Sequence, residues 1–296
     1  MPDSCSVFRM SRFYQASDAM GVEKEQTKAE IHPVVLMLAR ELEQPSQVTP
    51  EQASRARSLL ESFYQLEEDE ISPSLLLEAL EEDPVNLECH LELIDLCGLE
   101  DDLQLPVLTH LLQLAERKLP LKEGFHHPSA YWEDPFTRAY LRVAHRLAEE
   151  YHFQGQYQPA AALWSTLRPL DCQHMLPVGD WLLLTWLLLG DTAQADLLIA
   201  DDSQGLSACA KGWGKLLSHL IQGRESVLEI QWMEARQANP TMEACLIGTQ
   251  EVPPSHPMTW EPHTPEEAHA LADAMLPAWQ AHPEALRWLE SRVARE

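Results

Sequence analysis

The 296-residue sequence has few basic residues and no long apolar run, and each absence excludes a class of function. It contains 21 Lys and Arg residues against 47 Asp and Glu residues, a formal net charge of −26. Such an acidic surface repels phosphate groups, so we expect no direct binding to nucleic acid or to an anionic membrane. The most apolar run, Trp181–Leu189, is far shorter than the roughly 20 residues of a membrane-spanning helix. It predicts a buried helix instead.

Paired cysteines and a secretion signal are also missing. The 6 cysteines are scattered and include no C-x-x-C pair, and Met1–Gly21 contains no unbroken apolar core of a signal peptide. A chain of this length needs no disulfide bonds to fold, so we expect reduced thiols and a cytoplasmic location. The polar residues 1–30 predict a poorly ordered leader.

The common enzyme motifs are absent as well. The sequence has no G-x-S-x-G, H-E-x-x-H, G-x-x-x-x-G-K-[ST] or G-x-G-x-x-G, which favours a protein that is not an enzyme and needs no cofactor. Three histidine-containing pairs are candidate metal ligands, namely Cys89-His90, His126-His127 and Cys172-x-His174. None has a second pair at the spacing of a structural zinc site, so no metal site is predicted.

What the sequence does contain is helical character from Ile31 onward. Leu, Ala, Glu and Gln dominate, β-branched runs are rare, and no alternating strand pattern occurs. Thr49-Pro50-Glu51-Gln52 and Thr264-Pro265-Glu266-Glu267 each provide a hydroxyl N-cap, a proline at the first helical position and an acid or amide at the third. The chain is therefore predicted to be all-α, with helices starting at these two prolines.

Three glycines indicate that helix pairs repeat. Gly155, Gly190 and Gly223 lie between apolar helical segments, separated by 35 and 33 residues. These separations bracket the 34-residue period of tetratricopeptide helix pairs. Each glycine permits a tight turn, and small residues such as Ala160 and Ala195 at the start of the second helix let neighbouring helices approach closely. We therefore predict an α-α superhelix, a tetratricopeptide-like helical-repeat solenoid.

Breaks in the period divide the chain into five predicted segments. Prolines, Gly124 and two adjacent histidines interrupt the helical pattern between Lys118 and Pro135, and a second interruption follows Val252. The predicted segments are the leader 1–30, an acidic helical region with a partial repeat at 31–118, an irregular loop at 119–135, repeats at 136–250, and a connector with C-terminal capping helices at 251–296. Capping helices cover the hydrophobic end that a stack of repeats leaves open.

The segment from Gly155 to Trp164, followed by Leu170-Asp171, resembles a tetratricopeptide repeat. Residues 83–290 are similar to a bacterial tetratricopeptide-like family that itself resembles the C-terminal region of the eukaryotic suppression of tumorigenicity 7 protein. The matching motifs are Phe136-Thr-Arg138-Ala-Tyr140-Leu-Arg142, Ala238-Asn239-Pro240, Pro265-Glu266-Glu267-Ala268, Leu276-Pro277-Ala278-Trp279 and Pro283-Glu284-Ala285-Leu286. The resemblance implies a fold rather than an activity. The Asn-, Asp- and Gly-rich turn of the family is replaced here by Asp171-Cys-Gln-His174-Met.

The acidic residues are concentrated in one segment. Residues 61–104 contain 15 acids and no Lys or Arg, and so supply −15 of the net charge of −26. One interpretation is a landing surface for a basic partner, and the other is a solvated face that keeps the protein soluble. The segment also permits a third hypothesis, in which the chain mimics nucleic acid and inhibits a DNA- or RNA-binding protein.

Six residues are candidate contacts for a partner. Arg138 and Arg142 lie one helical turn apart and could bind a carboxylate. An internal ion pair with an acidic neighbour such as Glu133 or Glu149 is the interpretation that we favour for them. Tyr151 and Trp186 belong to the first helices of predicted pairs, which line the concave face of such arrays. Trp132 and Trp260 fall in irregular segments, where an aromatic side chain has less core to fill. They are candidates for contacting a partner or for plugging the concave groove.

The leading hypothesis is therefore a non-enzymatic scaffold, adaptor or chaperone-like protein. Its concave face would bind a protein or peptide, and the acidic N-terminal half would favour a basic partner. The alternatives are the nucleic-acid mimic and an enzyme with an unrecognised site in the 118–135 loop. Packing explains Trp164, Trp232 and Trp279, as well as Trp186, without any partner.

Overall fold

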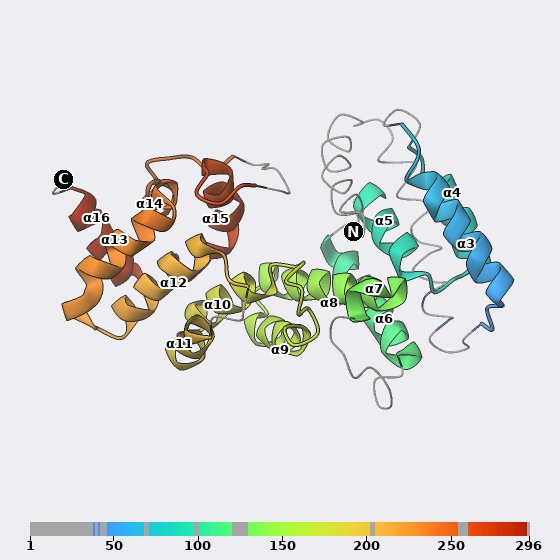
Figure 1. The fold of residues 1–296 in the computed structure, drawn as a ribbon, viewed down its shortest axis with the longest axis horizontal. Helices are drawn as coiled ribbons and strands as arrows, with labels where there is room; N and C mark the ends of the chain where they lie inside the picture. The colour runs from blue at the N-terminus through green and yellow to red at the C-terminus, as the bar shows by residue number, and fades with distance from the viewer. Residues whose placement is uncertain are drawn as a thin grey trace. The chain divides into compact units, whose positions relative to one another are not determined.

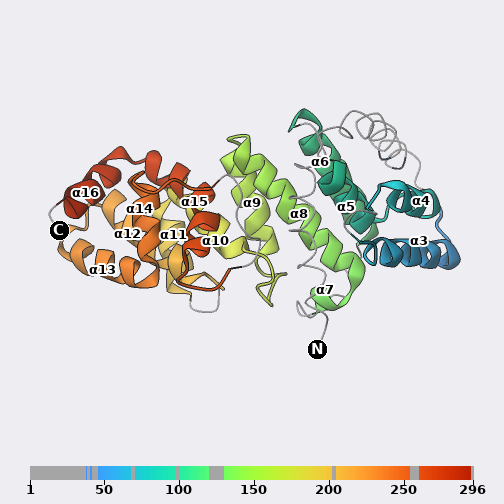
Figure 2. The ribbon, with the colours of Figure 1, turned by 90° about the horizontal axis from the view of Figure 1, so that it is seen from above.

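The described part of the protein, in a computed structural model, consists of helices joined by turns (Figures 1 and 2). The structure describes Leu38, Glu41 and residues 46–67, 71–97, 101–119, 130–201, 205–253 and 260–294. Within these ranges no strand is present, which confirms the all-α prediction, and no helix there is long and apolar enough to cross a membrane. The predicted leader 1–30 lies outside the described residues.

The chain divides into two compact units, one up to Glu150 and one from Tyr151 onward. The division falls within a single helix, α8 (Pro135–Phe153). The first unit also contains α3 (Pro50–Phe63), α4 (Ser74–Glu82), α5 (Leu87–Cys97), α6 (Asp101–Lys118) and the short α7 (Ala130–Glu133). The second contains α9 (Tyr157–Leu167), α10 (Val178–Leu188), α11 (Thr192–Ala200), α12 (Ala208–Ile221), the 3-10 turn η2 (Glu225–Val227), α13 (Leu228–Ala238), α14 (Pro240–Leu246), α15 (Pro265–Gln280) and α16 (Pro283–Val293).

The helix starts follow the local sequence. Thr49 and Gln52 form the reciprocal hydrogen bonds of a capping box at the start of α3, and Thr264 accepts a hydrogen bond from the Glu267 amide at the start of α15. Pro50 and Pro265 are the first residues of these helices, as predicted. The predicted irregular loop at 119–135 is wrong in its last part, because α7 occupies 130–133 and Pro135 begins α8.

In the first unit, α3 packs against α4, α4 against α5, and α5 against α6. The apolar stripes of these helices form the core, with Leu60, Phe63, Leu76 and Leu80 almost fully buried. Removal of this apolar surface from water is the main stabilising contribution.

In the second unit, glycine turns join the helices into hairpins. Gly155, Gly190 and Gly223 all have φ between +65° and +74°, a conformation that costs most other residues energy. The turn at Gly190 shows the shared pattern, in which Gly190 N–H bonds to the Leu187 carbonyl and Asp191 N–H bonds to the Trp186 carbonyl. These bonds form a Schellman motif, which satisfies carbonyls that the helix end leaves unpaired. The predicted turns at all three glycines are confirmed.

Successive hairpins of the second unit pack in a regular order. Helix α10 packs against α9, α11 and α12, while α12 packs against α10, α11 and α13. A β-carbon at Gly214 of α12 would lie 2.9 Å from Leu183 Cδ2 of α10, so a larger residue at this position would force the Leu183 side chain to shift. Because α10 is covered on several sides, its run from Trp181 to Leu189 is apolar around most of its circumference.

The C-terminal helices do not simply extend this order. Helix α15 packs against α10 and α12 as well as α14, and α16 packs against α15 and α12. Figure 1 shows α15 on the opposite side of α10 from α9 and α11. Met275 and Trp279 of α15 are fully buried, and Trp279 makes an edge contact with Trp213 of α12. The C-terminal segment therefore covers one side of the first helices α10 and α12.

Candidate functional site

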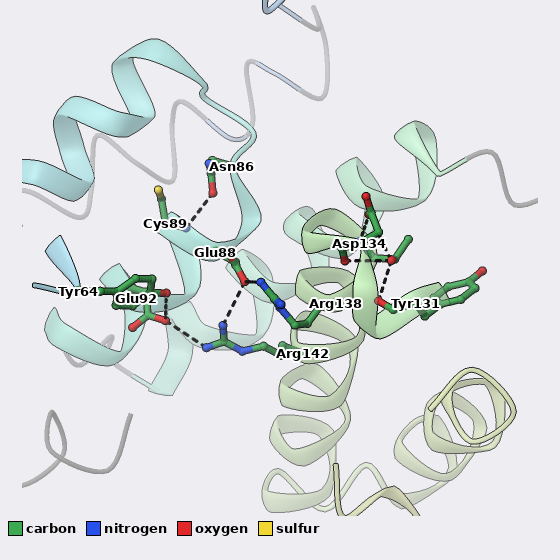
Figure 3. A network of polar contacts seen from close by, with 10 residues as sticks. Tyr64, Asn86, Glu88, Cys89, Glu92, Tyr131, Asp134, Arg138 and Arg142 are labelled. Atoms are coloured by element: carbon green, nitrogen blue, oxygen red, sulfur yellow. Dashed lines mark hydrogen bonds and ion pairs between the residues drawn. The ribbon is translucent and has the colours of Figure 1, made fainter. Parts of the chain in front are cut away.

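The two predicted arginines of α8 form ion pairs with α5 in the first unit (Figure 3). Arg138 Nη2 lies 3.4 Å from Glu88 Oε1, and Arg142 Nη2 lies 3.2 Å from Glu92 Oε1. Arg142 Nη1 is also 3.8 Å from Glu88 Oε1, which links the two pairs. In both helices the paired residues are four apart, so that one turn of α5 matches one turn of α8.

This network is largely shielded from water. The side chain of Glu92 is 3% exposed and that of Arg142 is 13% exposed, while Arg138 is more accessible at 30%. Tyr64, which follows the end of α3, donates a hydrogen bond of 2.8 Å from its hydroxyl to Glu92 Oε1. A buried carboxylate requires such partners, because an unpaired charge away from water is expensive.

Burial and charge set the ionisation of these groups. Burial alone would lower the pKa of Arg142, but the carboxylates of Glu92 and Glu88 outweigh it, and the pKa lies above its ordinary value. Burial, together with the charge of Glu92, raises the pKa of Tyr64. The phenol therefore keeps the proton that it donates. The cluster is a charged, hydrogen-bonded link between α3, α5 and α8.

Asp95, on the next turn of α5, differs from its neighbours. Burial raises its pKa to about 6, and the positive charges of Arg146 and Arg142 only partly oppose this shift. The ordinary pKa of an aspartate is 3.8. The carboxyl group of Asp95 consequently changes its charge at a higher pH than most aspartates do.

The structure gives the other predicted contact residues different surroundings. Trp132 is 9% exposed and lies in α7, so it contributes to the core instead of a loop surface. The α7–α8 junction is held by Thr137, whose hydroxyl donates to the Tyr131 carbonyl at 2.8 Å. Trp260 is half-buried in the connector before α15.

Tyr151 and Trp186 are half-buried and occupy equivalent positions, each four residues before a turn glycine. In both cases the backbone carbonyl accepts the hydrogen bond of the Schellman motif that comes from the amide five residues later. The predictions for the remaining tryptophans are confirmed, since Trp164, Trp232 and Trp279 are all buried.

A second polar group in the core was not predicted from the sequence. His152, at the end of α8, is buried among the rings of Tyr157, Trp164 and Trp181, with centroid separations of 5.1 to 5.8 Å. A hydrogen bond of 3.0 Å joins its Nδ1 atom to the Thr185 hydroxyl. Trp164 and Trp181 stack at 5.5 Å with 22° between their planes. The cluster joins the last turn of α8 to α9 and α10.

Metal-binding chemistry finds no support in the described ranges, which contain no group of three or more His, Cys, Asp or Glu side chains able to hold an ion. Burial raises the pKa of the Cys89 thiol and lowers the pKa of His90 to about 4. Cys89 and His90 are thus neutral residues of the core. The pair His126-His127 lies outside the described residues.

The chain was compared with protein-family models, with curated proteins and with solved structures, and none of them matches it. The residues that sequence analysis overlooked are Glu88 and Glu92. Their spacing of four equals that of Arg138 and Arg142, and this match is the signal that could have identified them as partners.

Proposed function

We propose that the protein is a non-enzymatic protein-interaction scaffold whose second unit is an array of tetratricopeptide-like helix pairs. The observation that carries this proposal is the packing order of the hairpins. The first helix α10 contacts the next first helix α12, and the second helices α9 and α11 contact the first helices that follow them. This nearest-neighbour order is characteristic of helical-repeat arrays.

Such arrays expose extended surfaces, and binding another protein is what these surfaces commonly do. The surface used here differs from the one expected from the sequence. Arg138 and Arg142 are engaged with Glu88 and Glu92, and α15 lies against α10 and α12. A partner therefore binds a side of the array that the chain itself leaves uncovered.

The two alternative functions gain no specific support. A nucleic-acid mimic needs outward-facing rows of carboxylates, whereas Glu88 and Glu92 of the acidic segment point to arginines of α8 (Figure 3). The proposed enzyme site in the 118–135 loop falls mostly on residues outside the described ranges.

Purification of the tagged full-length chain from its source cells tests this function. We expect a protein partner to co-purify at a fixed molar ratio. Salt should weaken its binding, because the chain carries a charge of −26. Gly190→Val is the variant intended to disrupt the array, because valine at a φ of +73° strains the hairpin turn. Glu284→Gln, an exposed change on α16, is the matched control that keeps the partner. The proposal fails if no partner is found, or if the partner remains bound when circular dichroism shows that Gly190→Val has lost its helices.

A further inference from the structure

The second helices of the hairpins share exposed positions at one repeat register. Seven residues after each turn glycine lie Ala162 of α9, Leu197 of α11 and Ile230 of α13, and all three are exposed. Ten residues after the same glycines lie Ser165, Ala200 and Met233, which are also exposed. We call these six residues the outer face. Equivalent positions in a repeat array form rows across successive repeats.

Large apolar side chains on this face are unusually accessible. Leu197 is 66% exposed, Ile230 61% and Met233 58%. The inward residues of the same helices are buried, as Leu198, Trp232 and Ala235 show. The exposure of the outer face is therefore a property of one side of each helix.

Charged side chains are depleted on this face, although the whole chain has 23% charged residues. Helix α9 contains none, and the single acid of α11, Asp196, is directed to α12 by hydrogen bonds to Ser218 Oγ (2.6 Å) and Gln222 Nε2 (3.0 Å). A surface composed for solubility carries about 25–35% charged residues. Depletion of charge with exposed apolar residues is typical of the centre of a protein interface.

The same bond network joins α11 to the helix that follows. Arg224, in the turn before α13, lies 3.1 Å from Asp196 Oδ2. Glu229 and Glu234 of α13 are paired with Arg292 and Lys215 at 3.2 and 3.5 Å. These contacts pair the charges of α11 and α13 with neighbouring helices, but the side chains of Glu229 and Glu234 remain 57% and 53% exposed beside Ile230 and Met233. The apolar side chains of Leu197, Ile230 and Met233 stay uncovered by the described chain.

Resting on the scaffold function, we propose that the outer face binds an amphipathic helix of a partner protein, with apolar residues on one side and Lys or Arg along its edges. Asp191 and Glu225 stand at the starts of the α11 and α13 segments, both exposed, and neither forms an ion pair within the described ranges. They complement basic edge residues. A second copy of this chain is the less favourable occupant, because it would bring two charges of −26 together.

A synthetic peptide of about 18 residues, roughly five helical turns, serves as the probe. It carries leucines on one face and lysines along both edges, and a fluorescent label reports its binding by anisotropy. We expect saturable binding to the full chain, weakened at least about tenfold by Leu197→Glu or Ile230→Glu, about 1.4 kcal/mol. The added negative charge would strengthen any non-specific attraction, so a weaker complex reports lost apolar contact.

Met175→Glu is the matched control, because it adds the same charge at another exposed apolar residue outside the outer face, and it should leave binding unchanged. A peptide with glutamates in place of lysines should not bind. The inference is overturned if Ile230→Glu has no effect, if the glutamate peptide binds equally well, or if sedimentation shows a dimer that Ile230→Glu dissociates.

The two proposals fail in different ways. A cellular partner that is retained by Leu197→Glu and Ile230→Glu contradicts the outer face but leaves the scaffold function intact. The absence of any cellular partner contradicts the scaffold function itself, whatever the peptide does.

Discussion

Arg142 and Glu92 are 50 residues apart in sequence, and their side chains meet at 3.2 Å in a nearly water-free contact. Two acids of the acidic segment, Glu88 and Glu92, and the arginine pair thus form the two sides of one contact, although they look like separate features in the sequence. Ion pairs therefore join α8 to α5, in addition to any apolar contacts between these helices.

Removal of one residue of this buried ion pair should lower the stability of the fold. Arg142→Ala leaves the carboxylate of Glu92 buried without its cation, and we expect the free energy of unfolding to fall by about 3–5 kcal/mol. Urea unfolding followed by circular dichroism measures this change. The triple variant Tyr64→Phe, Glu92→Leu, Arg142→Met should recover most of the loss, since it leaves no charge unpaired.

Arg55→Ala is the control for this experiment. It removes an ion pair with Glu82 that is 2.8 Å long but lies in solvent, and its effect should be within the measurement error. Equal losses for Arg55→Ala and Arg142→Ala would show that burial does not determine the strength of the α5–α8 contact.

Gly190 provides a test of the hairpin turns. Its φ is +73°, and a β-carbon there would meet nothing within 4 Å, so only the backbone conformation opposes a side chain. Gly190→Ala should lower the free energy of unfolding by about 1–2 kcal/mol. Gly190→Asn should cost less, because asparagine tolerates this conformation better. Equal stability of the alanine variant and the wild type would contradict the positive φ.

Asp180 predicts a specific pH dependence. Burial raises its pKa to about 6 from an ordinary value of 3.8, although the amide of Ser207 donates to it at 2.9 Å. Between these values the folded state binds more protons than the unfolded state. The ionisation of Asp180 therefore lowers the free energy of unfolding as pH rises from about 4 to 6. Asp180→Asn abolishes that loss and keeps an acceptor for Ser207. At pH 7 the variant should be more stable by about 1–3 kcal/mol.

The measurement is urea unfolding at several pH values between 4 and 7, comparing Asp180→Asn with the wild type at each pH. The stability difference should grow as pH rises and then level off above about 6. Asp191→Asn, a change at the exposed N-cap of α11, controls for general effects of removing a carboxylate. A difference that does not vary with pH would show that Asp180 is not responsible.

Trp279 tests whether α15 is an integral part of the second unit. Its ring is fully buried against Trp213, so Trp279→Ala should lower the free energy of unfolding by about 3–5 kcal/mol. Chemical unfolding followed by near-ultraviolet circular dichroism reports both stability and tryptophan packing. Trp260→Ala, in the half-buried connector, should have a much smaller effect. Similar losses for both variants would contradict the tight packing of α15 on α12.

Local features of the sequence were sufficient to locate helix starts and hairpin turns. The caps at Thr49 and Thr264 and the glycines at 155, 190 and 223 act through hydrogen bonds between residues at most five positions apart. Such contacts depend only on neighbouring residues, so a single sequence carries the information. The all-α class follows from the same local preferences.

Contacts between distant residues were decided by the tertiary structure. Spacing alone left Arg138 and Arg142 between an internal role and a partner-binding role, and only the approach of α5 to α8 supplied Glu88 and Glu92. The position of α15 against α10 and α12, and the burial of Trp132 in α7, likewise depend on which helices share a core. The reason is physical: hydrophobic burial is non-directional, so an apolar helix face identifies the need for a partner helix but not which helix meets it.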